Sequence, residues 1–117
     1  MDERAGGLIA WQFSLYPTGH RDRRNLLVHA LTNPLFLVGT VAVVSSPFAG
    51  LRALVGGLVG VVVAVAAQGR GHKLEASPPV PFRGPGDVAA RLFVEQWVTF
   101  PRYLVGGGFA AAWRAAR

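Results

Sequence analysis

The chain has 117 residues, enough for one domain and not for two separate hydrophobic cores. Hydrophobic residues make up 51% of it and charged residues only 15%, which excludes a disordered chain and argues against a highly charged soluble domain. The formal net charge is +6, but the basic residues are few and lie between long apolar stretches, so we expect no nucleic-acid partner. Cysteine is absent, which excludes disulfides, thiolate metal sites and a cysteine nucleophile.

The first predicted element is an amphipathic segment over residues 4–16. Trp11, Phe13 and Tyr16 concentrate aromatic side chains shortly before a basic cluster. Aromatic residues of this kind gather where a segment lies in the headgroup region of a bilayer. We therefore expect this flank to lie at a membrane surface.

Two apolar stretches follow, and they predict a membrane hairpin. Residues 25–51 contain no Asp, Glu, Lys or Arg. A bilayer core needs about 20 mostly apolar helical residues, so a helix over 26–44 is long enough to cross it, with Pro34 either kinking it or marking a break between two helical pieces. Residues 45–50 predict the turn, and residues 53–69 predict the second, shorter helix.

The basic residues around these stretches predict the orientation of the hairpin. Arg21, Arg23 and Arg24 precede the first stretch, and Arg70 and Lys73 follow the second. Cytoplasmic flanks of membrane helices carry an excess of Lys and Arg. The pattern predicts an integral membrane protein with both ends of the hairpin on the cytoplasmic side.

The second stretch also bears on helix packing. Gly56 and Gly60 have the spacing that lets another helix approach closely in lipid. The competing fold, a soluble four-helix bundle, needs polar helix faces, and residues 53–67 have none. Because short helices bury little surface among themselves, we expect a homo-oligomer as well.

A second amphipathic flank is predicted over residues 88–100. Val88, Leu92 and Phe100 recur at helical spacing, with Asp87 as N-cap and Pro101 ending or bending the helix. Residues 103–113 form either a third short membrane helix or a surface element. The fold class predicted for the single domain, residues 1–117, is therefore all-α, an integral membrane helical hairpin with flanking amphipathic helices.

The three histidines lie beside the cytoplasmic ends of the apolar stretches. His20 and His29 flank the start of the first stretch, and His72 follows the second, so closing the hairpin brings them to one side of the membrane. Asn25 shares a helix face with His29, and Glu75 lies three residues after His72. Three imidazoles and a carboxylate suit Fe(II) or Zn(II). The alternative is a set of interfacial histidines that anchor helix ends by hydrogen bonds.

Two separated motifs in these stretches resemble a known family. The first motif is Tyr16-x-x-x-His20-x-x-x-x-Asn25-x-x-x-His29-x-x-x-x-Pro34, and the second comprises Gln68, Gly71, His72, Glu75 and Pro78 or Pro79. Both are similar to motifs of the small membrane proteins related to the fungal 2-hydroxy-fatty-acid dioxygenase of sphingoid-base breakdown. The later segment from Glu95 to Tyr103 is similar in character to the C-terminal part of that family.

The resemblance implies a multi-helix membrane protein that holds Fe(II) and uses O2 to shorten 2-hydroxy fatty acids by one carbon. It implies His20, His29 and His72 as metal ligands. Glu75 becomes a fourth ligand or a group that orients a histidine, and Asn25 a hydrogen-bonding partner in the catalytic site. The candidate substrate-binding residues are Arg21, Arg70 and Lys73, which attract a carboxylate, together with Tyr16 and Gln68.

Three function classes remain open from the sequence. The first is a metal-dependent lipid oxygenase whose partner is a lipid or fatty-acid substrate. The second is a metal- or lipid-binding membrane protein of the same fold without turnover or with another reaction. The third is a structural or interaction hairpin. Metal analysis separates the third class from the others, and product analysis separates the first from the second.

Overall fold

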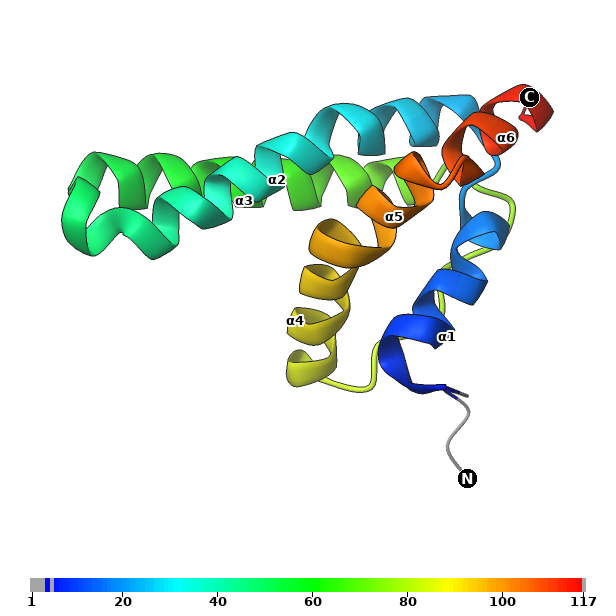
Figure 1. Cartoon of the computed structure of the whole chain (residues 1–117), viewed down its shortest axis with the longest axis horizontal. Coiled ribbons are helices and arrows are strands. Elements are labelled where there is room, and N and C mark those ends of the chain that lie inside the picture. The colour runs from blue at the N-terminus through cyan, green and yellow to red at the C-terminus, as the bar shows by residue number, and fades with distance from the viewer. Residues whose placement is uncertain (1–3, 5, 117) are drawn as a thin grey trace.

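The computed structural model describes residue 4 and residues 6–116, and within them the protein is all-α, as predicted (Figure 1). Two long apolar helices form a hairpin, and short helices flank it on both sides in the sequence. The α-helices are α1 (Gly7–Leu15), α2 (Arg23–Ala49), α3 (Leu51–His72), α4 (Pro85–Val94), α5 (Phe100–Val105) and α6 (Gly108–Ala115). A 3₁₀ turn, η1 (Tyr16–Gly19), follows α1, and a π-helix, η2 (Glu95–Thr99), joins α4 to α5.

The first hairpin helix is longer than the predicted 26–44. It starts after Asp22, whose carboxylate caps it by accepting the Arg24 N–H at 2.8 Å. It then continues through residues 45–49, where a turn was expected, and includes Pro47. Proline leaves the carbonyl four residues earlier without its usual donor, and here the Ser46 hydroxyl donates to that carbonyl, of Val43, at 2.7 Å. The helix therefore passes Pro47 without a break.

The hairpin turn is a single glycine, and small residues let the two helices approach. Gly50 has φ 96°, a backbone conformation that glycine adopts without strain. A Cβ atom at Gly57 would lie 2.6 Å from the Gly39 carbonyl oxygen, so the backbones of α2 and α3 are in close contact there. Gly60 packs on Leu35, whereas Gly56 faces open space. The contact stripe predicted from Gly56 and Gly60 thus includes Gly60 but runs through Gly57.

The outer faces of the hairpin are apolar and exposed. Val44 is 78% exposed and Phe48 near the tip 96% exposed. Helices α2 and α3 are long and apolar enough to cross a membrane, by length and composition. Helix α3 extends from Leu51 to His72, beyond the predicted 53–69 at both ends, so His72 belongs to the helix itself.

The C-terminal flank differs from the predicted helix over 88–100. Helix α4 begins at Pro85 behind an N-cap at Gly84, and Asp87 lies in its first turn, where its carboxylate accepts the Arg83 N–H. Helical structure then continues past Pro101 because η2 precedes it. In η2 the Phe100 N–H bonds to the Glu95 carbonyl, five residues back, so the register has already shifted before the proline.

The short helices gather around one end of the hairpin, while its tip projects away from them (Figure 1). Helices α1 and α4 lie to one side of the hairpin and run at a steep angle to its long axis. A small buried cluster of Tyr16, Leu26, Phe100 and Tyr103 joins the N-terminal flank, α2 and α5. The eight residues of α6 pack on this cluster through Phe109 and Trp113 and are too few to cross a bilayer.

Candidate metal centre

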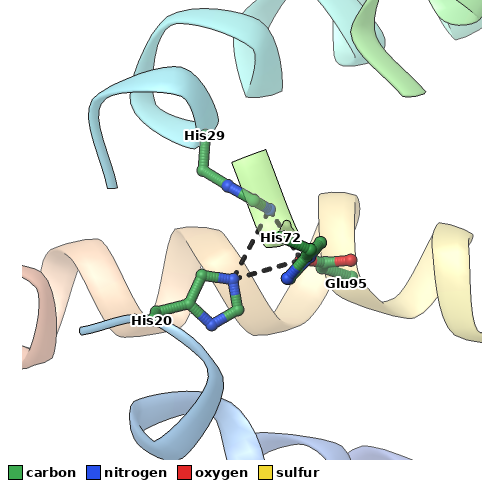
Figure 2. A group of neighbouring side chains, drawn as sticks. All are labelled: His20, His29, His72 and Glu95. Atoms are coloured by element: carbon green, nitrogen blue, oxygen red, sulfur yellow. Dashed lines mark hydrogen bonds and ion pairs between the residues drawn. The ribbon is translucent and has the colours of Figure 1, made fainter. Parts of the chain in front are cut away.

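Four side chains from four separate segments converge at the end of the hairpin (Figure 2). His20 follows η1, His29 lies in α2, His72 ends α3 and Glu95 opens η2. Each offers one ligand atom, and these atoms all lie within 4.8 Å of one another. His20 Nε2 is 3.4 Å from His29 Nε2, and His29 Nε2 is 3.4 Å from Glu95 Oε2. We refer to these four residues as the His3Glu group.

Two of the imidazoles are held in the orientation that a metal ligand needs. His20 donates its Nδ1–H to the Tyr16 carbonyl at 2.8 Å, and His29 donates its Nδ1–H to the Asn25 carbonyl at 3.0 Å. A carbonyl oxygen only accepts, so both Nδ1 atoms carry the proton. The Nε2 lone pairs are therefore free to bind a cation at the centre of the group, an arrangement common among metal-bound histidines.

Tyr16 supports the group at three points. Its ring stacks on the His20 ring at a centroid distance of 3.7 Å, and its backbone carbonyl holds His20 Nδ1. Its hydroxyl donates to Glu95 Oε2 at 3.1 Å. Burial and the neighbouring Glu95 raise the pKa of Tyr16 well above its usual range, so the phenol remains a donor.

The electrostatics favour a neutral imidazole beside an ionised carboxylate. Burial, followed by the charge of His29, lowers the pKa of His20 to about 3, so its ring is neutral near pH 7. Burial alone would raise the pKa of Glu95, but the neighbouring histidines, His29 foremost, outweigh it and leave that pKa lowered. Neutral imidazole and ionised carboxylate are the forms that bind metals.

The distances and donor types fit a divalent cation. Ligand bonds of about 2.0–2.1 Å put neighbouring ligand atoms of a tetrahedral site about 3.3 Å apart. The two 3.4 Å separations are close to that value, and the third, from His20 Nε2 to Glu95 Oε2, is 3.9 Å. Three imidazoles with one carboxylate suit iron or zinc and no sulfur-preferring ion. The His3Glu group could thus hold a metal ion.

Glu75 is not part of this group, although the sequence made it the expected carboxylate. Its side chain accepts the backbone N–H groups of Arg21 at 2.8 Å and Asp22 at 3.1 Å, and the Asn25 amide at 2.8 Å. These contacts place an anion at the N-terminal end of α2, where backbone N–H groups lack helical partners. Glu75 therefore ties the end of α3 to the start of α2 and supplies no ligand atom to the His3Glu group.

Asn25 and Gly71 also shape the centre without contributing a ligand atom. The Asn25 side-chain oxygen lies against Gly71, so closely that any side chain at position 71 would collide with it. This contact brings the first turn of α2 against the last turn of α3. His29 and His72 then face each other, with their ring centroids 4.9 Å apart.

Gln68 belongs to a buried amide network beside the group. Its Nε2 donates to Thr32 Oγ1 at 2.9 Å, and it exchanges hydrogen bonds with the Gln96 side chain at 2.6 and 3.1 Å. Asn33 donates to the Gln96 backbone carbonyl at 2.8 Å. That carbonyl is free because the π register takes the Phe100 N–H away from it and Pro101 has no N–H. The network fixes η2, and with it Glu95, against the hairpin.

The basic residues expected to attract a substrate lie outside the group. Arg21, Arg70 and Lys73 are exposed, and Arg21 lines a pocket of about 720 Å³ on the side of Glu75 and α6. Tyr16 and Gln68 line a second pocket, of about 360 Å³, which His20, His72 and Glu95 also border.

Sequence reasoning named Glu95 only as part of a similar C-terminal segment. The signal that could have found it is a carboxylate on the same helix face as Val88 and Leu92, within an otherwise apolar stretch. Comparisons with protein-family models, curated proteins and solved structures find no match for this chain.

Proposed function

We propose that this protein is an Fe(II)-dependent membrane dioxygenase that shortens a 2-hydroxy fatty acid by one carbon. The observation that carries the proposal is the His3Glu group, three imidazoles and a carboxylate converging within 4.8 Å at the base of an apolar hairpin. The two motifs similar to the fungal dioxygenase family supply eight of the residues discussed above, among them all three histidines.

Fe(II) fits the donor set, and when bound it would supply the capacity to react with O2. The reaction balances without an external reductant. A 2-hydroxy acid and O2 give the acid one carbon shorter, CO2 and water, with cleavage of the bond between the carboxyl carbon and the carbon that carries the hydroxyl. His20, His29, His72 and Glu95 would hold the ion, while Tyr16 fixes two of them.

The charge pattern supports a membrane position for this chemistry. Arg52 and Arg70 mark the ends of the uncharged part of α3. The 18 helical steps from one to the other span about 27 Å, close to the ~30 Å hydrocarbon core. His72 lies half a turn beyond Arg70, at headgroup level. Both ends of the hairpin would then lie on the cytoplasmic side, where Arg21 and Lys73 attract the carboxylate of a lipid substrate.

Metal analysis of the detergent-purified protein tests the proposal first. We expect about one iron per chain after anaerobic loading, and loss of that iron in His72→Ala with membrane insertion intact. Val63→Ala, on the exposed face of the same helix, is the matched control and should keep its iron. Iron content unchanged in His72→Ala would overturn the assignment of the metal site.

Product analysis tests the reaction itself. The iron-loaded protein is incubated with 2-hydroxypalmitate and O2, and we expect pentadecanoate and CO2 in equal amounts. Iron bound at the His3Glu group without any pentadecanoate would instead support the alternative function, a metal- or lipid-binding membrane protein of the same fold.

A further inference from the structure

A pocket of about 360 Å³ opens beside the His3Glu group. It lies between α1, α4 and the C-terminal half of α3, and residues 77–82 close its remaining side. His20, His72 and Glu95 border it at one end. Its volume falls within the range of about 300–1,000 Å³ typical of small-molecule sites.

The walls away from the metal group are mainly apolar. Trp11 and Leu15 come from α1, Leu92 and Val88 from α4, and Val65 from α3. Such walls take a hydrocarbon chain because removing its methylene groups from water is favourable. Polar side chains such as Gln12, Thr18 and Ser77 also line the pocket, but they are fewer than the apolar ones.

Arg91 also lines the pocket, but its guanidinium is already engaged. It lies over the rings of Phe82 and Trp11, 4.3 and 5.3 Å from their centroids. Its Nη1 donates to the carbonyls of Val80 and Pro81 at 3.0 and 3.3 Å. Arg91 therefore holds residues 77–82 over the pocket as a wall and keeps its own charge turned to the protein.

The pocket runs along α4 away from the metal group. Glu95, Leu92 and Val88 lie three, four and seven residues apart in sequence, which puts them on one helix face. The rise of an α-helix makes the distance from Glu95 to Val88 about 10 Å along the axis. Leu92 is one turn from the metal ligand and Val88 two turns.

The other pocket at the group has a different character. His20 borders it as well, but its walls include Arg21, Asp22 and Glu75. Burying an apolar chain against these charged groups would strip them of water without a compensating bond. The two pockets thus meet at His20. The second brings three charged side chains close to the group, although alanines of α6 and Leu74 line the rest of it.

We propose that the pocket between α1 and α4 binds the acyl chain of a single-chain 2-hydroxy fatty acid, with Leu92 and Val88 setting the accepted chain length. This inference rests on the proposed function for the position of the acid head at the His3Glu group. The tail then extends from Glu95 past Leu92 toward Val88. The pocket bordered by Arg21 and Glu75 is left unoccupied by the tail.

Two tryptophan substitutions and a control test the length dependence. Leu92→Trp should block the channel one turn from the metal group, and Val88→Trp two turns from it. Ala90→Trp adds the same side chain on an exposed position of α4 that does not line the pocket. All three are compared with the wild type on saturated 2-hydroxy acids from 2-hydroxyhexanoate to 2-hydroxystearate, with iron content measured alongside.

The variants should separate by chain length. Leu92→Trp should lower kcat/KM for 2-hydroxypalmitate relative to 2-hydroxyhexanoate by ~tenfold or more, since even one methylene that does not fit changes selection by about 10-fold or more. Val88→Trp should show the same loss starting at chains longer by about one helical turn, ~5 Å. Ala90→Trp should keep the wild-type profile. If the wild type turns over 2-hydroxypalmitate and all three variants show the same dependence of kcat/KM on chain length as the wild type, the channel is overturned and the proposed function stands.

A binding assay keeps the two proposals apart. Displacement of a fluorescent fatty acid by the same series of 2-hydroxy acids reads the channel without any turnover. Suppose that the chain-length limit for displacement shifts in Leu92→Trp and Val88→Trp, while the wild-type protein forms no pentadecanoate. This pair of results would uphold the channel and reject the dioxygenase reaction. Equal displacement by short and long acids in every variant would reject the channel. If Leu92→Trp does not fold, Val88→Trp and Leu92→Ala, which should extend the accepted length, provide the same comparison.

Discussion

Replacing Tyr16 by phenylalanine removes one hydroxyl from the metal centre and leaves the ring in place. The phenylalanine can keep the stack on His20, and the backbone carbonyl that holds His20 Nδ1 is unchanged. What is lost is the hydrogen bond to Glu95 Oε2. The substitution therefore tests whether that bond fixes the carboxylate for metal binding.

The size of the effect follows from the geometry of this bond. Hydrogen bonds to charged groups contribute about 1.5–3 kcal/mol. At 3.1 Å the bond is longer than the 2.5–2.7 Å of the strongest O–H···O⁻ pairs, so the lower end of that range applies. We expect a loss of about 1.5 kcal/mol, which corresponds to roughly a tenfold weaker metal affinity.

Chelator competition with Co(II) measures this affinity, and the visible spectrum of the bound Co(II) reports its ligand geometry. Tyr103→Phe is the matched control, because Tyr103 is equally buried and packs on Tyr16 without a described bond to Glu95. We expect weaker affinity and an altered spectrum in Tyr16→Phe and neither change in Tyr103→Phe. Wild-type affinity in Tyr16→Phe, or an equal loss in Tyr103→Phe, would refute the positioning role.

Three further predictions concern the fold around the centre. Gly57→Leu should lower the thermal unfolding temperature in detergent, since its side chain would enter the close contact between α2 and α3 at a cost of about 1–3 kcal/mol, whereas Gly56→Leu on the open face should not. Glu75→Ala should lower metal affinity without removing a ligand, because the start of α2 loses its anchor; a chelator titration that matches the wild type would contradict this. The hydrogen bond from Arg4 holds the pKa of Asp87 well below its usual range, so the pair stabilises the fold fully above pH ~4. This contribution is lost as the pH falls further. Asp87→Asn should therefore flatten the acid side of a curve of unfolding free energy against pH.

The hairpin could be predicted because its signal is local. A charge-free stretch over residues 25–51 and a second stretch without polar faces require no knowledge of the rest of the fold. Its limits were harder to predict. The Ser46 hydroxyl donates to the Val43 carbonyl, and α2 continues past Pro47 with that carbonyl satisfied. A side-chain hydrogen bond of this kind depends on rotamers that composition does not encode.

The carboxylate of the metal centre shows the same limit more clearly. Glu75 is close to His72 in sequence, and spacing alone favoured it. Which carboxylate reaches the histidines is decided by the packing of η2 against the hairpin, a long-range arrangement fixed by the amide network around Gln96. Periodicity predicts that Glu95 shares a face with Leu92 but not what that face contacts.

The order in which the four ligands are synthesised has a consequence for assembly. The three histidines lie in the first 72 residues, so the hairpin can insert and bring the imidazoles together before Glu95 leaves the ribosome. A cation met at that stage would find only uncharged nitrogen donors. Firm retention would have to wait until the docking of η2 adds the negative charge of Glu95, so a metal centre at the His3Glu group would be completed only after the hairpin has formed.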